Sequence, residues 1–257
     1  MLQTEEMHYL QQHFRLTQKS SMDHLETVKA LDLFEPKKCE SYLNHLTKVL
    51  DFPSLQVAAS QLSKRYAYMV VLPVLFSMSV WNKGLMMKAD HCFIEPDWKA
   101  DRWMPRLRLE SGLTSNIEGE REVWRDRLIQ ELFAENITRV WHTLTLVTRV
   151  PLSTLWENTA IYIFWLYEEK IKDFDNHTRQ RANADLQYLI HAASPRLFGE
   201  AQNPLKKFDS PKTYVIDEDS YIRIRQTCCL YYQTHILGTC CKSCPRKVKK
   251  NKAIPQI

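Results

Sequence analysis

Apolar residues recur every three or four positions through most of the chain before Pro204, which is the spacing of amphipathic helices. Two of these segments begin after Pro36 and Pro53, and proline is favoured at helix starts. The uncharged run over 66–82 contains Pro73 and is shorter than the roughly 20 residues of a membrane span, so we interpret it as a buried core helix. The apolar positions of the two segments are Leu43, Leu46, Val49 and Leu50, then Leu55, Ala58, Leu62 and Tyr66.

A third apolar stripe predicts a long helix that ends before Pro151. Ser115 and Glu118 have the spacing of a capping box at its start, and Thr154 and Glu157 are candidate caps of the next helix. A further helix is expected over 185–193. The stripe of the long helix comprises Trp124, Leu128, Leu132, Ile137, Val140 or Trp141, Leu144 and Val147, and the next helix is expected to bury Leu155, Ile161, Phe164, Trp165 and Leu166.

The pattern changes to alternation in two places. Between residues 85 and 109, Leu107 and Leu109 alternate with arginines, which predicts a short hairpin or small sheet. After Pro204 a loop leads to Ile222 and Ile224, which alternate with arginines as in a half-buried strand. We therefore predict an α+β fold, with a predominantly helical body over 1–203, a small β element, and a C-terminal module over 204–257.

Composition agrees with this fold. With 257 residues, 44% of them hydrophobic, and only 5 glycines, the chain can build a substantial helical core without disulfides. The first thirty residues lack the apolar centre of a secretory signal, so a cytoplasmic location is expected. The net charge of +5 is concentrated in a basic tail, which we interpret as a solvated end. The tail residues are Arg246, Lys247, Lys249, Lys250 and Lys252.

Five of the 7 cysteines lie between positions 228 and 244. Thiols in the cytosol stay reduced and bind soft metals rather than forming disulfides. Structural zinc usually takes two separated Cys-x2-4-Cys pairs, and only Cys241 and Cys244 have this spacing. The side chains of the adjacent pair Cys228 and Cys229 diverge, so they fit poorly on a single tetrahedral metal. A two-iron cluster suits them better, because it offers two metal sites that each need two thiolates. Zinc stays open as the alternative. Cys39 and Cys92 are isolated and are expected to be small buried hydrophobes.

The cysteine motif resembles a known family. Thr227-Cys-Cys-Leu-Tyr-Tyr232 followed by Cys241-x-x-Cys244-Pro245 is similar to the C-terminal signature of FhuF-like ferric-siderophore reductases, and Leu155-Trp-Glu-Asn158 resembles the family loosely. The resemblance implies an iron-sulfur module with a 2Fe-2S cluster and one-electron reduction of a ferric siderophore, usually of the hydroxamate type. The cysteine spacing is one residue longer than usual, and a shift to Cys240 would leave Ser243 at the last position. The implied ligands are therefore Cys228, Cys229, Cys241 and Cys244.

One electron is enough to open a siderophore, since hard oxygen ligands hold Fe3+ far better than Fe2+. All-thiolate clusters reach potentials near roughly −400 mV, low enough for this reduction. The chain has no glycine-rich nucleotide loop, so the electron is expected from a low-potential donor protein or a small reductant. The cations that flank the cysteines are candidate contacts for an anionic chelate or an acidic donor. They are Arg223, Arg225, Lys242 and Arg246.

Two other functions remain open at this stage. The cysteines also suit an iron-sulfur or zinc regulator that senses metal and engages nucleic acid through the basic tail, or a structural zinc clip on a helical interaction protein. A sensor that reads nucleic acid needs a recognition element, and no helix-turn-helix pattern lies next to the cysteines. We therefore predict no nucleic-acid partner and no transmembrane span, and we leave a peripheral association with a membrane open.

Overall fold

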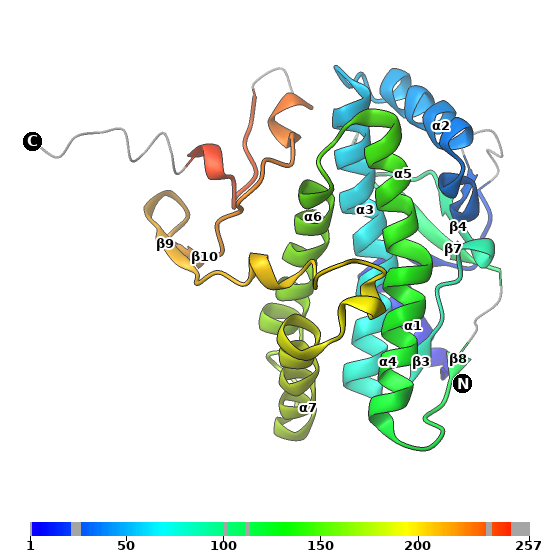
Figure 1. Ribbon diagram of the computed structural model, residues 1–257, viewed down its shortest axis with the longest axis vertical. Coiled ribbons are helices and arrows are strands. Elements are labelled where there is room, and N and C mark those ends of the chain that lie inside the picture. Colours follow the sequence, from blue (N-terminus) through cyan, green and yellow to red (C-terminus); the bar gives the residue numbers. More distant parts are fainter. Residues whose placement is uncertain (1, 22–26, 100–101, 111–113, 235–237, 248–257) are drawn as a thin grey trace, which may run out of the picture.

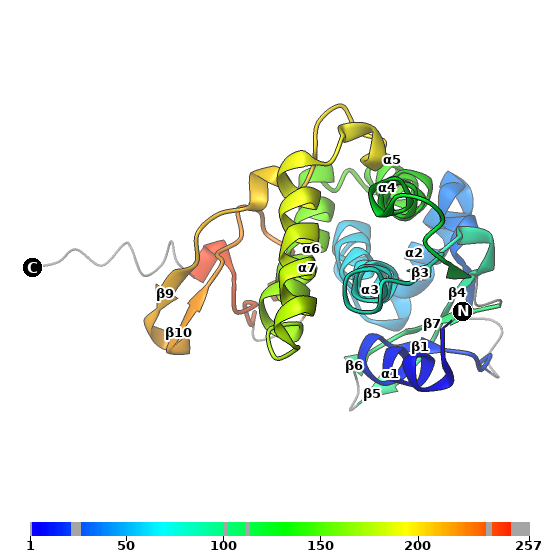
Figure 2. The ribbon, with the colours of Figure 1, turned by 90° about the horizontal axis from the view of Figure 1, so that it is seen from below.

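Seven α-helices dominate the computed structural model, which describes residues 2–21, 27–99, 102–110, 114–234 and 238–247. The tail residues Lys249, Lys250 and Lys252 lie outside the described residues. Figures 1 and 2 show α3 in the middle of the bundle, with α5 and α6 beside it. The helices are α1 (Thr4–Phe14), α2 (Pro36–Val49), α3 (Leu55–Phe76), α4 (Arg121–Leu132), α5 (Thr138–Thr148), α6 (Leu152–Trp165) and α7 (Asn176–Gln187).

The central helix α3 begins at a serine cap, where the Ser54 side chain accepts a hydrogen bond from the Val57 amide. It continues through Pro73, its C-terminal half is almost entirely buried, and a π-helical turn (Ser77–Trp81) follows. The prediction of a buried core helix over 66–82 is confirmed. Among the described residues, no helix has the length and apolar character needed to cross a membrane.

The predicted long helix is observed as α4 and α5, joined through a π-helical turn (Phe133–Ile137). Its apolar stripe is buried, apart from a half-buried Val147. The predicted capping box is wrong, because the helix begins only at Arg121. Ser115 lies instead in a short strand and accepts a hydrogen bond from the Trp124 indole at 3.1 Å.

The predicted caps of the next helix are also wrong. Helix α6 begins at Leu152, so Thr154 and Glu157 lie inside it, and both are buried. The helix predicted over 185–193 starts earlier, at Asn176, where the Asp175 side chain caps the Thr178 amide. Further π-helical turns end α6 (Leu166–Lys170) and α7 (Tyr188–Ala192). The 3-10 turns are η1 (Ala30–Phe34), η3 (Ala89–His91), η7 (Pro195–Phe198), η8 (Lys206–Phe208), η9 (Ile216–Glu218) and η10 (Tyr231–Gln233).

The β-structure is divided among small sheets, and the predicted sheet over 85–109 is confirmed. The largest has the order β1-β7-β4-β2, with β1 (Leu16–Thr17) parallel to β7 (Arg106–Leu109). Its other strands, β4 (Cys92–Glu95) and β2 (Val28–Lys29), pair antiparallel. Three two-stranded sheets remain: β3 (Gly84–Leu85) with β8 (Thr114–Ser115), β5 (Trp98–Lys99) with β6 (Arg102–Trp103), and β9 (Thr213–Val215) with β10 (Ser220–Ile222).

The C-terminal segment lies beside α6, on the opposite side of the helices from β4 and β7 (Figures 1 and 2). The predicted strand over 221–225 is right only as far as Ile222, where β10 ends. Beyond it the predicted alternation fails, because Arg225 is buried whereas Ile224 is only half-buried. Arg225 is buried because its polar partners on α6, Glu157 and Asn158, are themselves buried. The observed fold is α+β with a helical body, as predicted.

One buried ion pair fixes α7 against the body. The fully buried Asp185 carboxylate accepts two hydrogen bonds from Arg121, at 2.7 and 2.8 Å, and one from Ser79. We expect Asp185→Ala to lower the free energy of unfolding by about 2 to 3 kcal/mol, because a charged group loses its partner in the interior. Urea denaturation measures this loss. The matched change Asp173→Ala, at an exposed position, is expected to cost under about 0.5 kcal/mol. Equal losses in the two variants would contradict this role of Asp185.

Candidate metal centre

The two halves of the cysteine motif meet in the C-terminal segment. The sulfur atoms of Cys229 and Cys241 lie 3.7 Å apart, and Cys229 and Cys244 are buried. The second half forms a tight turn, in which the Cys244 amide donates to the Cys241 carbonyl at 3.1 Å. The Arg225 amide donates to the Ser243 carbonyl at 3.0 Å, which ties the approach to the first half onto this turn. Cys228, Cys240 and Cys241 are half-buried.

Polar side chains of α3 hold the first cysteine pair in place. Ser60 Oγ and Gln61 Nε2 each donate to the Cys229 carbonyl at 2.8 Å. Asn158 on α6 donates in turn to Ser60 and to Ser63, the latter at 2.8 Å. All of these side chains are buried, so each needs a partner in the interior, and the cysteine backbone supplies part of it. The position of Cys229 is therefore set by the helical body.

Glu157 on α6 fixes the residues just before the cysteines. Its carboxylate accepts hydrogen bonds from the amides of Gln226 and Thr227, at 2.6 and 2.7 Å, and from the Thr227 hydroxyl. Arg225 Nε lies 3.5 Å from this carboxylate, and Arg225 Nη2 donates to Asn158 Oδ1 at 2.7 Å. The side chains of Arg225 and Glu157 are 0% and 3% exposed. Charge-assisted hydrogen bonds in such a buried place hold the backbone firmly.

The local charges favour a thiolate at Cys229. The pKa of Cys229 is lowered, chiefly by the hydrogen bond that it shares with the Cys241 thiol, and Lys64 and Arg225 add to this against the effect of burial. The pKa of Cys241 is raised, since its proton is held by Cys229. Burial raises the pKa of Cys228, and the neighbouring Cys229 and Cys244 add to the effect. Thiolate is the form of cysteine that binds metals.

One pair of thiols, Cys229 and Cys241, has the spacing that a tetrahedral metal requires. With metal–sulfur bonds of about 2.3 Å, two sulfurs on one tetrahedral ion lie about 3.8 Å apart, close to the observed separation of Cys229 and Cys241. In the part of the chain that the structure describes, no three candidate ligands gather around one point. A two-iron cluster asks for two such pairs rather than one group of four. The buried Nη1 of Arg225 has no hydrogen-bond partner among the described residues, and cluster sulfur atoms accept such bonds.

The four cations predicted to contact a chelate are placed differently from one another. Arg223 pairs with Glu168, at 2.5 Å, and with Asp209, and Arg225 is buried as described above. Lys242 is exposed, 3.7 Å from Glu218. The guanidinium of Arg246 lies over the ring of Tyr232 at 4.1 Å. Arg223 and Arg225 therefore already have internal partners, and contact of any of the four with a chelate stays a prediction.

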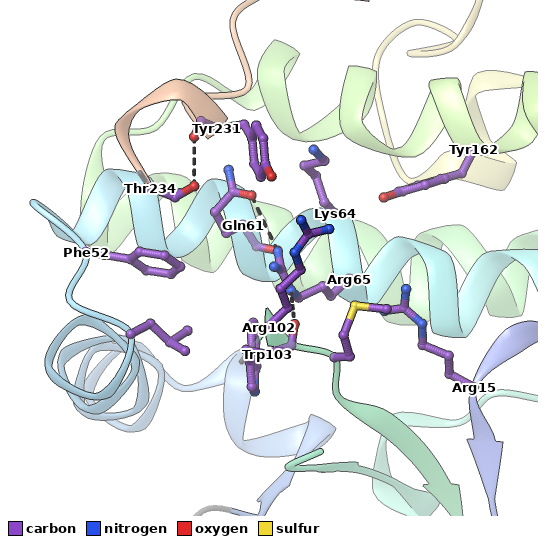
Figure 3. A pocket seen from close by; sticks show the side chains of 12 residues that line it. Arg15, Phe52, Gln61, Lys64, Arg65, Arg102, Trp103, Tyr162, Tyr231 and Thr234 are labelled. Atoms are coloured by element: carbon purple, nitrogen blue, oxygen red, sulfur yellow. Dashed lines mark hydrogen bonds between the residues drawn. The ribbon is translucent and has the colours of Figure 1, made fainter. Parts of the chain in front are cut away.

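A pocket of about 350 Å³ lies beside Cys229, between α3, the loop around β6 and the turn η10 (Figure 3). Lys64 belongs both to the pocket and to the cysteine centre, because its Nζ lies 3.9 Å from Cys229 Sγ. Tyr231, two residues after Cys229, forms part of the wall, together with Arg15, Arg65, Arg102 and Trp103. The remaining lining residues are Leu50, Phe52, Gln61, Met104, Tyr162 and Thr234.

The sequence analysis did not identify the residues of the helical body that hold the cysteine segment. Glu157 was interpreted as a helix cap, and no role was predicted for the polar positions of α3. A signal for them does exist in the sequence. Ser60-Gln61 and Ser63-Lys64-Arg65 interrupt a helix that is buried on nearly every side, and buried polar groups need partners. What those partners are is not visible in the sequence, because they come from residues far along the chain.

Comparison with known proteins bears on the helical body. No curated protein matches the chain. The profile of a family described as "Ferric iron reductase FhuF-like transporter" matches residues 60–211, which is more than half of the chain. The matched region starts at Ser60, includes Glu157 and Asn158, and ends before the C-terminal cysteines. The chain therefore belongs to the ferric iron reductase FhuF-like family.

Proposed function

We propose that this protein reduces ferric iron held in a siderophore. Family membership supports a ferric iron reductase role. The observation that carries the proposal is the meeting of Cys229 and Cys241, 3.7 Å apart, at the edge of a pocket lined by cations. Lys64 lines the pocket, and its Nζ lies 3.9 Å from Cys229 Sγ. One side chain therefore separates the pocket from this sulfur. The closeness of the cysteines to this cationic pocket supports a metal centre with a substrate site beside it.

Cys228, Cys229, Cys241 and Cys244 are the proposed ligands of a 2Fe-2S cluster, with Cys240 outside the set. When bound, the cluster supplies one electron at a time at low potential. Glu157 and Arg225 hold the backbone before the first cysteine pair, and Ser60 and Gln61 hold the carbonyl of Cys229. This network supports the ligands from the helical body. The division into a body over 1–203 and a cluster-binding module over 204–257 is part of the proposal.

The substrate iron gains one electron and changes from Fe3+ to Fe2+. The hard oxygen donors of the siderophore bind Fe2+ much more weakly, so the ion is released, and protons from water neutralise the freed oxygens. Lys64 lines the pocket and its Nζ lies 3.9 Å from Cys229 Sγ, so a substrate in the pocket would lie near the ligand sulfur. Each turnover consumes one electron, which we assign to a low-potential donor protein or a small reductant. A cytoplasmic location is part of the same proposal.

The first test is to purify the protein without oxygen and measure iron, zinc and sulfide together with visible and EPR spectra, before and after dithionite. We expect a red-brown protein with iron and sulfide in equal amounts. Its reduced form is expected to show the EPR signal of one unpaired electron and to lose it when a ferric siderophore is added, as an equal amount of Fe2+ appears. A colourless protein that holds zinc would instead establish a structural clip, because the sulfur spacing also suits zinc.

A further inference from the structure

The side chain of Lys64 reaches from α3 to the first cysteine pair. Its Nζ lies 3.9 Å from Cys229 Sγ, within hydrogen-bonding range of a sulfur atom, and 5.1 Å from the centre of the Tyr231 ring. Figure 3 shows Lys64 turned toward Tyr231. The side chain is half-buried, so water screens its charge less than it screens a charge on the open surface. The ammonium group of Lys64 is therefore close enough to act on the sulfur of Cys229.

The same helix fixes both the charge and the sulfur. Ser60 and Gln61, about one helical turn before Lys64, each donate a hydrogen bond to the Cys229 carbonyl at 2.8 Å. Residues three and four positions apart lie on one face of a helix, so this face of α3 contacts Cys229 through its backbone and through its sulfur. The distance between the ammonium group and the sulfur is thus set by a rigid element of the body rather than by a loop.

A second cation, Arg225, lies near the cysteines, but it is paired with a carboxylate. Arg225 Nε lies 3.5 Å from Glu157, and both side chains are buried. The opposite charges of such a pair largely cancel at a distance, so the pair acts weakly on atoms outside it. Lys64, by contrast, has the Cys229 sulfur itself as its hydrogen-bond partner. Its charge therefore acts directly on a proposed ligand atom.

Resting on the proposed function and its 2Fe-2S cluster, we propose that the Lys64 ammonium group raises the reduction potential of that cluster through the sulfur of Cys229. Reduction adds one electron and so one negative charge, which a cation beside a ligand sulfur stabilises more in the reduced form than in the oxidised form. The electron comes from the donor protein or small reductant and leaves to the ferric iron of the substrate. Lys64 thus makes the first transfer more favourable and leaves a smaller driving force for the second.

The test is a redox titration of the anaerobically purified protein, followed by the EPR signal of the reduced cluster and carried out without a siderophore. Lys64→Met keeps a flexible side chain of similar length and removes the charge and the donor. We expect it to lower the ratio of reduced to oxidised cluster at a fixed solution potential about tenfold, which is a fall of about 59 mV in the midpoint potential. Lys64→Arg keeps a cation and is expected to restore most of the difference.

Lys88→Met is the matched control, since it changes the net charge equally at an exposed position just before η3, outside the pocket lining. It is expected to leave the potential unchanged. Iron and sulfide content checks that each variant holds its cluster, and Lys64→Gln takes the place of Lys64→Met if the latter does not.

An unchanged or higher potential in the neutral Lys64 variant, an equal fall in Lys88→Met, or a potential of Lys64→Arg as low as that of the neutral variant would overturn the inference. Failure of the reductase proposal looks different. The potential would then still fall in the Lys64 variant, while the reduced protein left ferric siderophores unchanged. A colourless zinc protein would overturn both proposals.

Discussion

Replacing Glu157 with alanine is expected to lower the free energy of unfolding by about 3 to 5 kcal/mol and to abolish cluster retention. The substitution leaves the buried Arg225 without its carboxylate and frees the amides of Gln226 and Thr227. Those amides directly precede the first cysteine pair, so the geometry of Cys228 and Cys229 is lost with them. Denaturant unfolding gives the stability, and iron and sulfide content per chain gives the retention.

Two variants separate these effects. Glu157→Gln keeps an oxygen that accepts one amide hydrogen bond but loses the charge, so we expect it to fold and to retain less iron than the unaltered protein. Glu40→Ala removes an exposed carboxylate from α2 and is expected to change stability by under about 0.5 kcal/mol. If Glu157→Ala retained iron and sulfide at the level of Glu40→Ala, the proposed anchoring of the cysteine segment by α6 would be wrong.

Cys241→Ser is expected to lower the iron and sulfide content at least about tenfold, because a serine oxygen is a poor ligand where soft thiolates are required. Cys240→Ser is expected to retain the cluster. The structure supports this choice between neighbouring cysteines, since Cys241 lies 3.7 Å from Cys229 and closes a turn onto Cys244. Elemental analysis and the EPR amplitude of the reduced protein measure both variants.

Cys92→Ala serves as the control for a buried cysteine in the body, in strand β4 of the small sheet. It is expected to keep its iron even where its stability falls. The assignment of the ligands fails if Cys240→Ser loses the cluster and Cys241→Ser keeps it. Loss of the cluster in both variants would indicate that Cys240 takes part as well, and the four-cysteine set would then need revision.

The sequence predicted elements where a local signal suffices. The helical spacing after Pro36 and Pro53, and the stripe from Trp124 to Leu144, predicted helices that the structure confirms. The period of an amphipathic helix can be recognised from neighbouring residues alone. The predicted caps at two helix starts were wrong. Ser115 and Glu157 have the right types and spacing for caps, yet each found a stronger partner elsewhere in the fold.

By itself the sequence determined the α+β fold with its helical body and the group of cysteines near the C-terminus. Both are local properties of composition and spacing. Only the tertiary structure decided that Glu157, Asn158, Ser60 and Gln61 would hold the cysteine segment, and that Lys64 would join it to a cationic pocket. These contacts connect residues far apart in the chain. Their energy depends on excluding water from charged groups, and only the packed interior provides that condition.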